Sequence, residues 1–189
     1  MNKTEIQEII KSHFPTLNRD SVIILSKYAS FLNLKKRTEL ISERKRHHSF
    51  YLILKGSAKA YYTKESKEVC SWFAFENEIV ATIGAFNGLP SNETVVLLED
   101  SKLLQFKTES IKELANTNLD ISHLLNYVIT EHAVFLEEKL YQLQFMSSEE
   151  RYKALINVAP EILQKVSLTD IASYLGVSRE TLSRIRRKK

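Results

Sequence analysis

Cysteine is nearly absent from this chain, since Cys70 is the only one among 189 residues. A single cysteine excludes an internal disulfide, a multi-cysteine zinc site and an iron–sulfur cluster held by four cysteines of one chain. Long apolar runs are also missing, because none approaches the roughly 20 residues that a membrane-spanning helix needs. The first residues, MNKTEIQEIIKSHF, lack the unbroken apolar centre of a signal peptide. We therefore expect a cytoplasmic protein.

The sequence also lacks the usual marks of an active site, and we expect no enzyme activity. No Ser-His-Asp spacing, phosphate-binding loop or paired-carboxylate motif is evident. His47 and His48 are adjacent, and neighbouring side chains of a strand point to opposite faces, so they make poor joint metal ligands. We expect no metal site and a buried, inert thiol at Cys70.

The net charge of +4 lies entirely in residues 147–189, because residues 1–146 hold equal numbers of basic and acidic residues. Six of the cations in this tail lie at or after Arg179. Such asymmetry favours a polyanionic partner for the tail. On charge alone, a solubilising basic C-terminus explains it equally well.

The pattern of apolar residues predicts helices first and then short strands. Ile6, Ile10 and Phe14 recur at helical spacing until Pro15, and a second helix follows Asn18. The segments SFLNLKKRTELIS, YLILKGSAKAYY, EVCSWFAF, NETVVLLED and SKLLQFK are rich in β-forming residues and separated by turn signals. This spacing predicts a small antiparallel roll, with Trp72, Phe73 and Phe75 in its core.

Two local signals refine this reading. Gly56 interrupts YLILKGSAKAYY, which indicates a tight turn or a close backbone approach between strands. Thr108 is expected to cap a helix that follows the last strand.

The segment 120–144 contains no proline or glycine and predicts one long helix. Apolar residues on it alternate in steps of four and three, as in a coiled-coil seam. The predicted dimer seam consists of Ile121, Leu125, Val128, His132 and Phe135. A second apolar stripe beside it consists of Leu124, Ile129, Leu136, Leu140 and Leu143. Two stripes favour a two-fold dimer, although a helix buried on both sides within one chain would also carry them.

The last 23 residues, SLTDIASYLGVSRETLSRIRRKK, predict a helix-turn-helix. Ser167 can cap the first helix, Gly176 supplies the left-handed turn, and Ser178 can cap the second helix. The start of a second helix in this motif enters the major groove of DNA. The predicted base-reading residues are Arg179, Glu180, Ser183 and Arg184.

The stretch LTDIASYLGVSRETLSRIRR closely resembles the DNA-binding helices of the Crp/Fnr family of bacterial transcription regulators, and the order of elements resembles that family over the whole chain. The resemblance implies an α+β fold: an N-terminal antiparallel β-roll (a jelly-roll-like double-stranded β-helix) with flanking helices, a dimerisation helix and a small helix-turn-helix domain. The corresponding boundaries are 1–117 for a cyclic-nucleotide-binding-like domain, 118–146 for the dimerisation helix and 147–189 for the DNA-binding domain.

The same resemblance implies a homodimer that binds double-stranded DNA at an inverted-repeat operator and acts with RNA polymerase. The groove-reading pair of the family falls on Arg179 and Glu180, and its downstream arginine falls on Arg184. The expected phosphate contacts are Ser167, Thr169, Ser178, Thr181, Arg186, Arg187, Lys188 and Lys189.

Three departures from the family pattern restrict the function. Thr82 replaces the glutamate that binds the ribose of a cyclic nucleotide, and Asn92 replaces the arginine that binds its phosphate, so we expect no binding of cyclic AMP. Candidate residues for another effector are Thr82, Gly84, Asn92 and Thr94. One cysteine cannot hold the oxygen-sensing cluster of the Fnr branch. No β-hairpin wing follows the second helix, so we expect the basic tail to contact phosphates instead.

A second class of function stays open at this point. The chain would then be a β-roll small-molecule-binding protein or a cupin-like metalloenzyme, and its basic tail would be incidental. A cupin-like site needs several histidines and carboxylates converging inside the roll, and the roll offers only His47 and His48. His132 could form a pH-sensitive contact in the dimer seam, although a hydrogen-bonded seam histidine is the simpler expectation.

Overall fold

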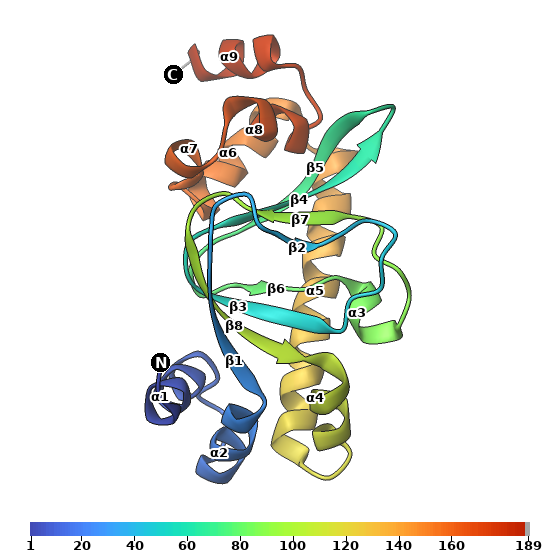
Figure 1. Cartoon of the computed structure of the whole chain (residues 1–189). Coiled ribbons are helices and arrows are strands. Elements are labelled where there is room, and N and C mark those ends of the chain that lie inside the picture. The colour runs from blue at the N-terminus through green and yellow to red at the C-terminus, as the bar shows by residue number, and fades with distance from the viewer. Residues whose placement is uncertain (188–189) are drawn as a thin grey trace.

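The computed structural model describes residues 1–187, and its centre is a roll of two antiparallel sheets that face each other (Figure 1). One sheet has the strand order β1-β8-β3-β6 and the other β2-β7-β4-β5. The strands are β1 (Ala29–Leu34), β2 (Glu39–Ile41), β3 (Ser49–Lys55), β4 (Ala58–Lys64), β5 (Lys67–Ala74), β6 (Ile79–Val80), β7 (Thr94–Leu97) and β8 (Ser101–Lys107). This arrangement confirms the predicted antiparallel roll.

Helices flank the roll before, within and after its strands. These helices are α1 (Lys3–His13), α2 (Arg19–Lys27), α3 (Ile83–Asn87) and α4 (Thr108–Ala115). Asn2 and Glu5 form a capping box at α1, and Asn18 accepts a hydrogen bond from the Ser21 amide at α2. The cap predicted at Thr108 is wrong, because Lys107 is the N-cap and Thr108 is already helical.

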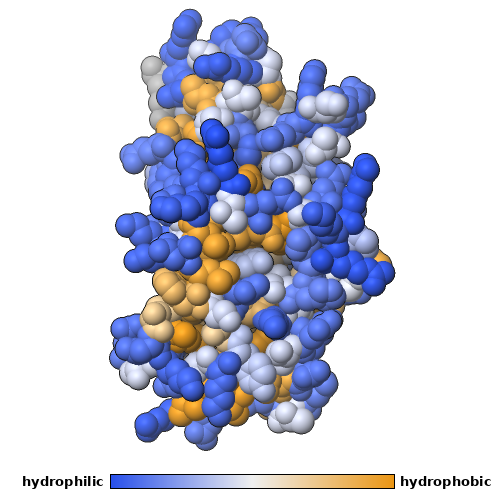
Figure 2. All heavy atoms as spheres, in the orientation of Figure 1, coloured by the Kyte–Doolittle hydropathy of each residue, from blue (hydrophilic) through white to orange (hydrophobic). Residues whose placement is uncertain are grey.

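The apolar residues of the roll form two neighbouring cores. Between the sheets lie Leu40, Ile41, Ile53, Ala60, Trp72, Val95 and Leu103. On the outer side of the first sheet, Phe50, Leu52, Leu104 and Phe106 pack against residues from α1, α2, α4 and α5. Figure 2 shows one face of the molecule, on which hydrophilic side chains predominate and apolar ones gather in a band across the middle.

Gly56 joins β3 to β4 with a φ of +117°, a conformation that L side chains rarely adopt. A Cβ atom at this position would lie 2.1 Å from Ser101 Oγ and 3.0 Å from Ser101 Cα. The prediction of a close backbone approach at Gly56 is therefore confirmed.

Helix α5 (Leu119–Phe145) runs along the roll and leads into four short helices, which we call the head (Figure 1). The head consists of α6 (Ser148–Val158), α7 (Ile162–Lys165), α8 (Leu168–Tyr174) and α9 (Arg179–Arg187). Asn118 caps α5, and Ser147 with Glu150 forms a capping box at α6. The predicted division into domains at 117/118 and 146/147 stays a prediction.

Phe73 and Phe75 do not belong to the core of the roll, contrary to the sequence prediction. Phe75 is buried with Tyr152, Ile162 and residues of α8 and α9, and Phe73 packs against the same cluster. The end of β5 thus forms part of the core of the head. Among the described residues, no helix is both long and apolar enough to cross a membrane.

Candidate nucleic-acid interface and effector cavity

Helices α8 and α9 are joined by a short turn, and local hydrogen bonds fix the starts of both helices. Ser167 Oγ accepts a hydrogen bond from the Asp170 amide at 3.1 Å, and Ser178 Oγ accepts one from the Thr181 amide at 3.1 Å. Gly176 has a φ of +68°, as the left-handed end of a helix requires. Ala172, Leu175 and Leu182 are buried between the helices.

The outer face of α9 brings the four predicted base-reading residues together. Arg179, Glu180, Ser183 and Arg184 line one surface depression together with Arg187. Hydrogen bonds from its own backbone and from Ser178 hold the pKa of Glu180 below its usual value, so its carboxylate is charged at neutral pH. This face therefore offers both hydrogen-bond donors and an acceptor to a ligand.

The residues predicted to contact phosphates differ in how free their side chains are. The hydroxyls of Ser167 and Ser178 already cap helices, and Ser167 also donates to Asp170 Oδ2 at 2.8 Å. Thr169, Arg186 and Arg187 are exposed, and Thr181 is partly exposed. Lys188 and Lys189 lie outside the described residues.

Hydrogen bonds and an ion pair attach α8 to the second sheet of the roll. Lys59 Nζ lies 2.8 Å from Asp170 Oδ1 and 2.6 Å from Glu68 Oε2. Burial works against the charge of Lys59, but its hydrogen bonds to Asp170 and Glu68 raise its pKa. The Cys70 amide donates a hydrogen bond to Ser173 Oγ at 2.9 Å. Sequence analysis missed this contact, because its partners lie more than 100 positions apart.

The long helix contacts the same part of the head. Lys139 Nζ lies 3.1 Å from the centroid of the Tyr174 ring and donates a hydrogen bond to the Tyr174 carbonyl at 3.1 Å. Burial lowers the pKa of Lys139 to about 8. Arg151 donates to the Leu175 carbonyl at 3.0 Å. Both cations lie at the C-terminal end of α8, where its carbonyl groups favour positive charge.

The face of α5 that we predicted as a dimer seam is turned towards its own chain. Ile121 and Val128 are 0% and 6% exposed and belong to the outer core of the roll. Phe135 packs against the core between the sheets, while Leu125 and His132 are partly buried. The seam assignment is wrong for Ile121 and Val128, because side chains buried in their own chain cannot reach a partner.

The neighbouring stripe of α5 is exposed instead. The exposed fractions of Ile129, Leu136, Leu140 and Leu143 are 38%, 51%, 55% and 51%. Together with the exposed Ala133 they alternate in steps of four and three, the spacing of a coiled-coil seam. Leu124 is the exception in this predicted second stripe, since it is buried in the outer core.

Of the four predicted effector residues, only Thr82 lines the cavity described below. Asn92 is exposed in the loop before β7. Thr94 Oγ1 accepts a hydrogen bond from the Glu43 amide at 3.2 Å. At Gly84, a Cβ atom would lie 2.6 Å from the Leu89 carbonyl oxygen, so this glycine is needed for close packing.

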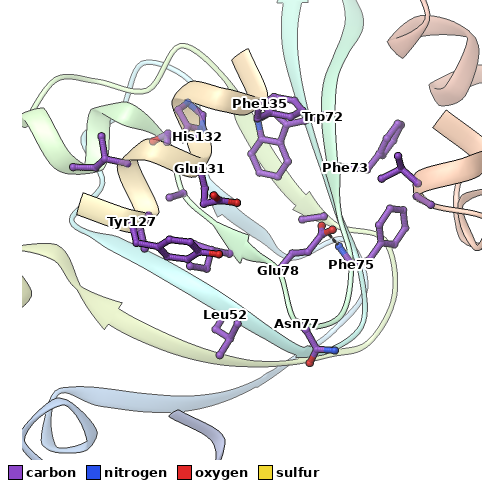
Figure 3. Close-up of a pocket in the computed structure, with 18 of the residues that line it drawn as sticks. Leu52, Trp72, Phe73, Phe75, Asn77, Glu78, Tyr127, Glu131, His132 and Phe135 are labelled. Atoms are coloured by element: carbon purple, nitrogen blue, oxygen red, sulfur yellow. Dashed lines mark hydrogen bonds between the residues drawn. The ribbon is translucent and has the colours of Figure 1, made fainter. Parts of the chain in front are cut away.

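A cavity of about 450 Å³ lies where the roll, α5 and the head meet. Figure 3 shows Trp72, Phe75 and Glu78 on one side of it and Tyr127, Glu131 and His132 of α5 on the other. Residues of α6 and α7, among them Leu155 and Ile162, also line it, as do His13 of α1 and Phe86 of α3. Sequence analysis missed this cavity, because its walls come from segments that lie far apart in the chain.

Residues 31–118 match the family model described as the cyclic nucleotide-binding domain. No curated protein matches the chain significantly in sequence. FixK2 from Bradyrhizobium japonicum shares 17% identity over 85% of this chain and 83% of its own, with a TM-score of 0.73. A putative regulator of the Crp/Fnr family from Eubacterium rectale shares 18% identity over 94% of this chain and 87% of its own, with a TM-score of 0.72. The catabolite activator protein of Thermus thermophilus shares 18% identity over 93% of this chain and 85% of its own, with a TM-score of 0.59.

The chain has the Crp/Fnr fold. Its roll, long helix and C-terminal helices follow the order that the sequence resemblance implied, so the predicted fold is confirmed. At these identities the likeness fixes the fold, and the function has to be argued from the residues of this chain.

Within the Crp/Fnr fold, this chain places a buried carboxylate beside the expected nucleotide cassette. Glu93, next to Asn92, is 7% exposed. Its carboxylate accepts hydrogen bonds from Trp72 Nε1 at 3.0 and 3.1 Å and from Ser71 Oγ at 2.9 Å. Burial raises the pKa of Glu93, although these hydrogen bonds act against the rise. The signal that sequence analysis missed is a glutamate directly beside the position expected for a phosphate-binding arginine.

The weaker candidate sites can also be placed. His47 Nε2 accepts a hydrogen bond from the Ser42 amide at 2.8 Å, while His48 Nδ1 lies 3.2 Å from Glu109. The two histidines thus have separate partners, and the described residues contain no group of three or more side chains placed to hold a metal. Cys70 is buried, and burial raises the pKa of its thiol to about 12, so it is a poor nucleophile at neutral pH.

Proposed function

We propose that this protein is a homodimeric, sequence-specific DNA-binding transcription regulator of the Crp/Fnr type. The observation that carries the proposal is the outward face of α9, where Arg179, Glu180 and Arg184 lie at the start of the second helix of a helix-turn-helix. This is the part of the motif that enters the major groove. An arginine such as Arg184 can bind guanine O6 and N7 through two hydrogen bonds, and Glu180 can accept from cytosine N4.

The exposed stripe of α5 supports the dimer. A row of apolar side chains at coiled-coil spacing is unfavourable in water and is buried when the same stripe of a second copy packs against it. A two-fold dimer presents two copies of α9 in inverted orientation. Its operator is then an inverted repeat whose half-site centres lie about 10 bp apart, or a multiple of that. RNA polymerase is the expected protein partner.

The regulator responds to an effector other than cyclic AMP. Neither Thr82 nor Asn92 can replace a charged anchor, and the carboxylate of Glu93 lies next to Asn92. When it is ionised, this carboxylate repels a cyclic phosphate. The cavity between roll, α5 and head supports an effector site of different chemistry.

Substitution of Arg184 tests the proposal. Arg184→Ala should weaken binding to the preferred operator by about 1–3 kcal/mol per half-site and relax the preference at one base pair. Arg44→Ala is the matched control, because this arginine is highly exposed but lies on the roll. Lys188→Ala and Lys189→Ala should weaken all sequences alike and flatten the salt dependence by about one unit per lost phosphate contact.

Fluorescence anisotropy with labelled duplexes at two salt concentrations separates these classes of variant. If Arg184→Ala and Arg44→Ala bind every duplex as the wild type does, α9 does not read DNA. The alternative, a small-molecule-binding roll with an incidental basic tail, would then be favoured.

A further inference from the structure

The cavity at the junction of roll, α5 and head has the size of a ligand site. Its volume of about 450 Å³ falls within the range of roughly 300–1,000 Å³ that small-molecule sites occupy. Figure 3 shows four aromatic side chains around it, Trp72 and Phe75 from the roll side and Tyr127 and Phe135 from α5. Aromatic rings thus form much of the wall, and they present electron-rich faces to a bound molecule.

The carboxylates that line this cavity face no lysine or arginine among the described lining residues. The lining carries the carboxylates of Glu78 and Glu131 together with the imidazoles of His13 and His132. Their side chains approach from opposite walls, Glu131 from α5 and Glu78 from the loop before β6 (Figure 3). Glu78 Oε2 accepts one hydrogen bond, from the Phe75 amide at 2.9 Å. A positive charge between the two carboxylates would be stabilised, and a negative charge would be repelled.

Two further observations point to a missing partner. Glu78 is exposed at the surface, yet desolvation by its neighbours raises its pKa; the hydrogen bond from the Phe75 amide acts against this rise, and the charge of Glu161 adds to it. The Thr82 hydroxyl is buried and has no hydrogen-bond partner among the described residues, and Thr82 also lines the cavity. An unpaired buried hydroxyl is costly, and a ligand with a polar group can satisfy it.

We propose that this cavity binds a small organic cation, an amine or onium group on an apolar body, between Glu78, Glu131 and the aromatic walls. Cations are attracted to the faces of Trp and Tyr rings, and aromatic sites with nearby carboxylates suit quaternary ammonium groups. This ligand class is opposite in charge to a cyclic nucleotide.

The position of the cavity connects the ligand to the head. Leu155, Val158 and Ile162 of the head line it together with residues of the roll and of α5. A ligand that contacts the roll, α5 and the head together stabilises the relative positions that these three parts have in this structure. Only this consequence rests on the proposed regulator function, because binding itself needs no DNA.

A titration of the full-length chain tests the proposal. Trp72 is the single tryptophan and lines the cavity, so its fluorescence reports on binding at this site. Tetraphenylphosphonium and tetraphenylborate have the same shape and opposite charge. We expect the phosphonium to bind at least about tenfold more tightly, a difference of about 1.4 kcal/mol. Glu131→Gln and Glu78→Gln should each reduce this preference severalfold.

Glu137→Gln is the matched control, because Glu137 is exposed on the same helix and does not line the cavity. It should leave both titrations unchanged, and thermal unfolding verifies that all variants fold. Equal or tighter binding of the borate would overturn the proposal. So would a phosphonium preference that persists in the Glu78→Gln, Glu131→Gln double variant. DNA binding is measured separately, so its failure and the failure of the cation site are distinguishable.

Discussion

Lys59 of β4 lies 2.8 Å from Asp170 of α8, and this ion pair connects the roll to the head. The side chain of Lys59 is only 12% exposed, so the pair is shielded from water. Without Lys59, the Asp170 carboxylate would lose the cation that offsets the cost of its partial burial.

Removing this cation should therefore destabilise the junction of roll and head. We expect Lys59→Met to lower the free energy of unfolding by about 1–3 kcal/mol and to speed amide exchange in α8. Lys35→Met removes the exposed pair with Asp100 and should change stability by no more than about 0.5 kcal/mol. Denaturant unfolding with hydrogen exchange measures both, and equal effects of the two variants would refute a special role for Lys59.

Gly56 provides a second stability test. Gly56→Ala should cost about 2–4 kcal/mol, because it adds a strained φ to a clash with Ser101. Gly88 has a φ of +75° but nothing within 4 Å of an added Cβ, so Gly88→Ala should cost only about 1 kcal/mol. Thermal denaturation compares the two, and a milder effect at Gly56 would show that the strand junction can relax.

The exposed stripe of α5 makes a prediction about assembly. Leu136→Glu and Leu140→Glu place charges in the proposed seam and should convert dimers into folded monomers, since a buried unpaired charge costs several kcal/mol. Val134 is 44% exposed on the same helix but outside the stripe, so Val134→Glu should remain dimeric. Light scattering decides between these outcomes. A wild type that is monomeric at micromolar concentration would contradict the dimer.

Glu93 makes a prediction about pH. Its raised pKa means that the folded state binds this proton more tightly than the unfolded state does. The protonated group therefore stabilises the fold below its ordinary pKa, and this contribution is lost as the pH rises through the raised pKa. In Glu93→Gln the neutral side chain removes this titration.

The stability of the wild type should consequently fall relative to Glu93→Gln between about pH 4 and neutral pH. Glu8→Gln changes an exposed glutamate and should run parallel to the wild type. Chemical denaturation at several pH values measures the difference. If the difference in free energy of unfolding between the wild type and Glu93→Gln is the same at every pH, the pKa of Glu93 does not change on folding.

The sequence predicted those parts of the fold that depend on local signals. The caps at Ser167 and Ser178 and the left-handed Gly176 are determined by residues within a few positions, so the last two helices and their turn could be placed directly. The close backbone approach at Gly56 could be predicted in the same way, because a glycine between two β-forming runs has few other roles.

The choice of helix face could not be made in this way. Both stripes of α5 are apolar and have the same spacing, and only the position of the roll decides that Ile121 and Val128 are buried while Leu136 and Leu140 are exposed. The assignment of Phe75 to the core of the roll failed for a similar reason, since this residue packs in the head. Strand periodicity shows which side a residue faces but not what packs against it.

Selection of DNA from a random pool by the unmodified chain tests the central claim most directly. The account predicts enrichment of an inverted repeat with half-site centres about 10 bp apart, or a multiple of that, and with a G·C pair at the position lost in Arg184→Ala. Recovery of no common motif, or of a single asymmetric site, would contradict a two-fold regulator that reads DNA through α9.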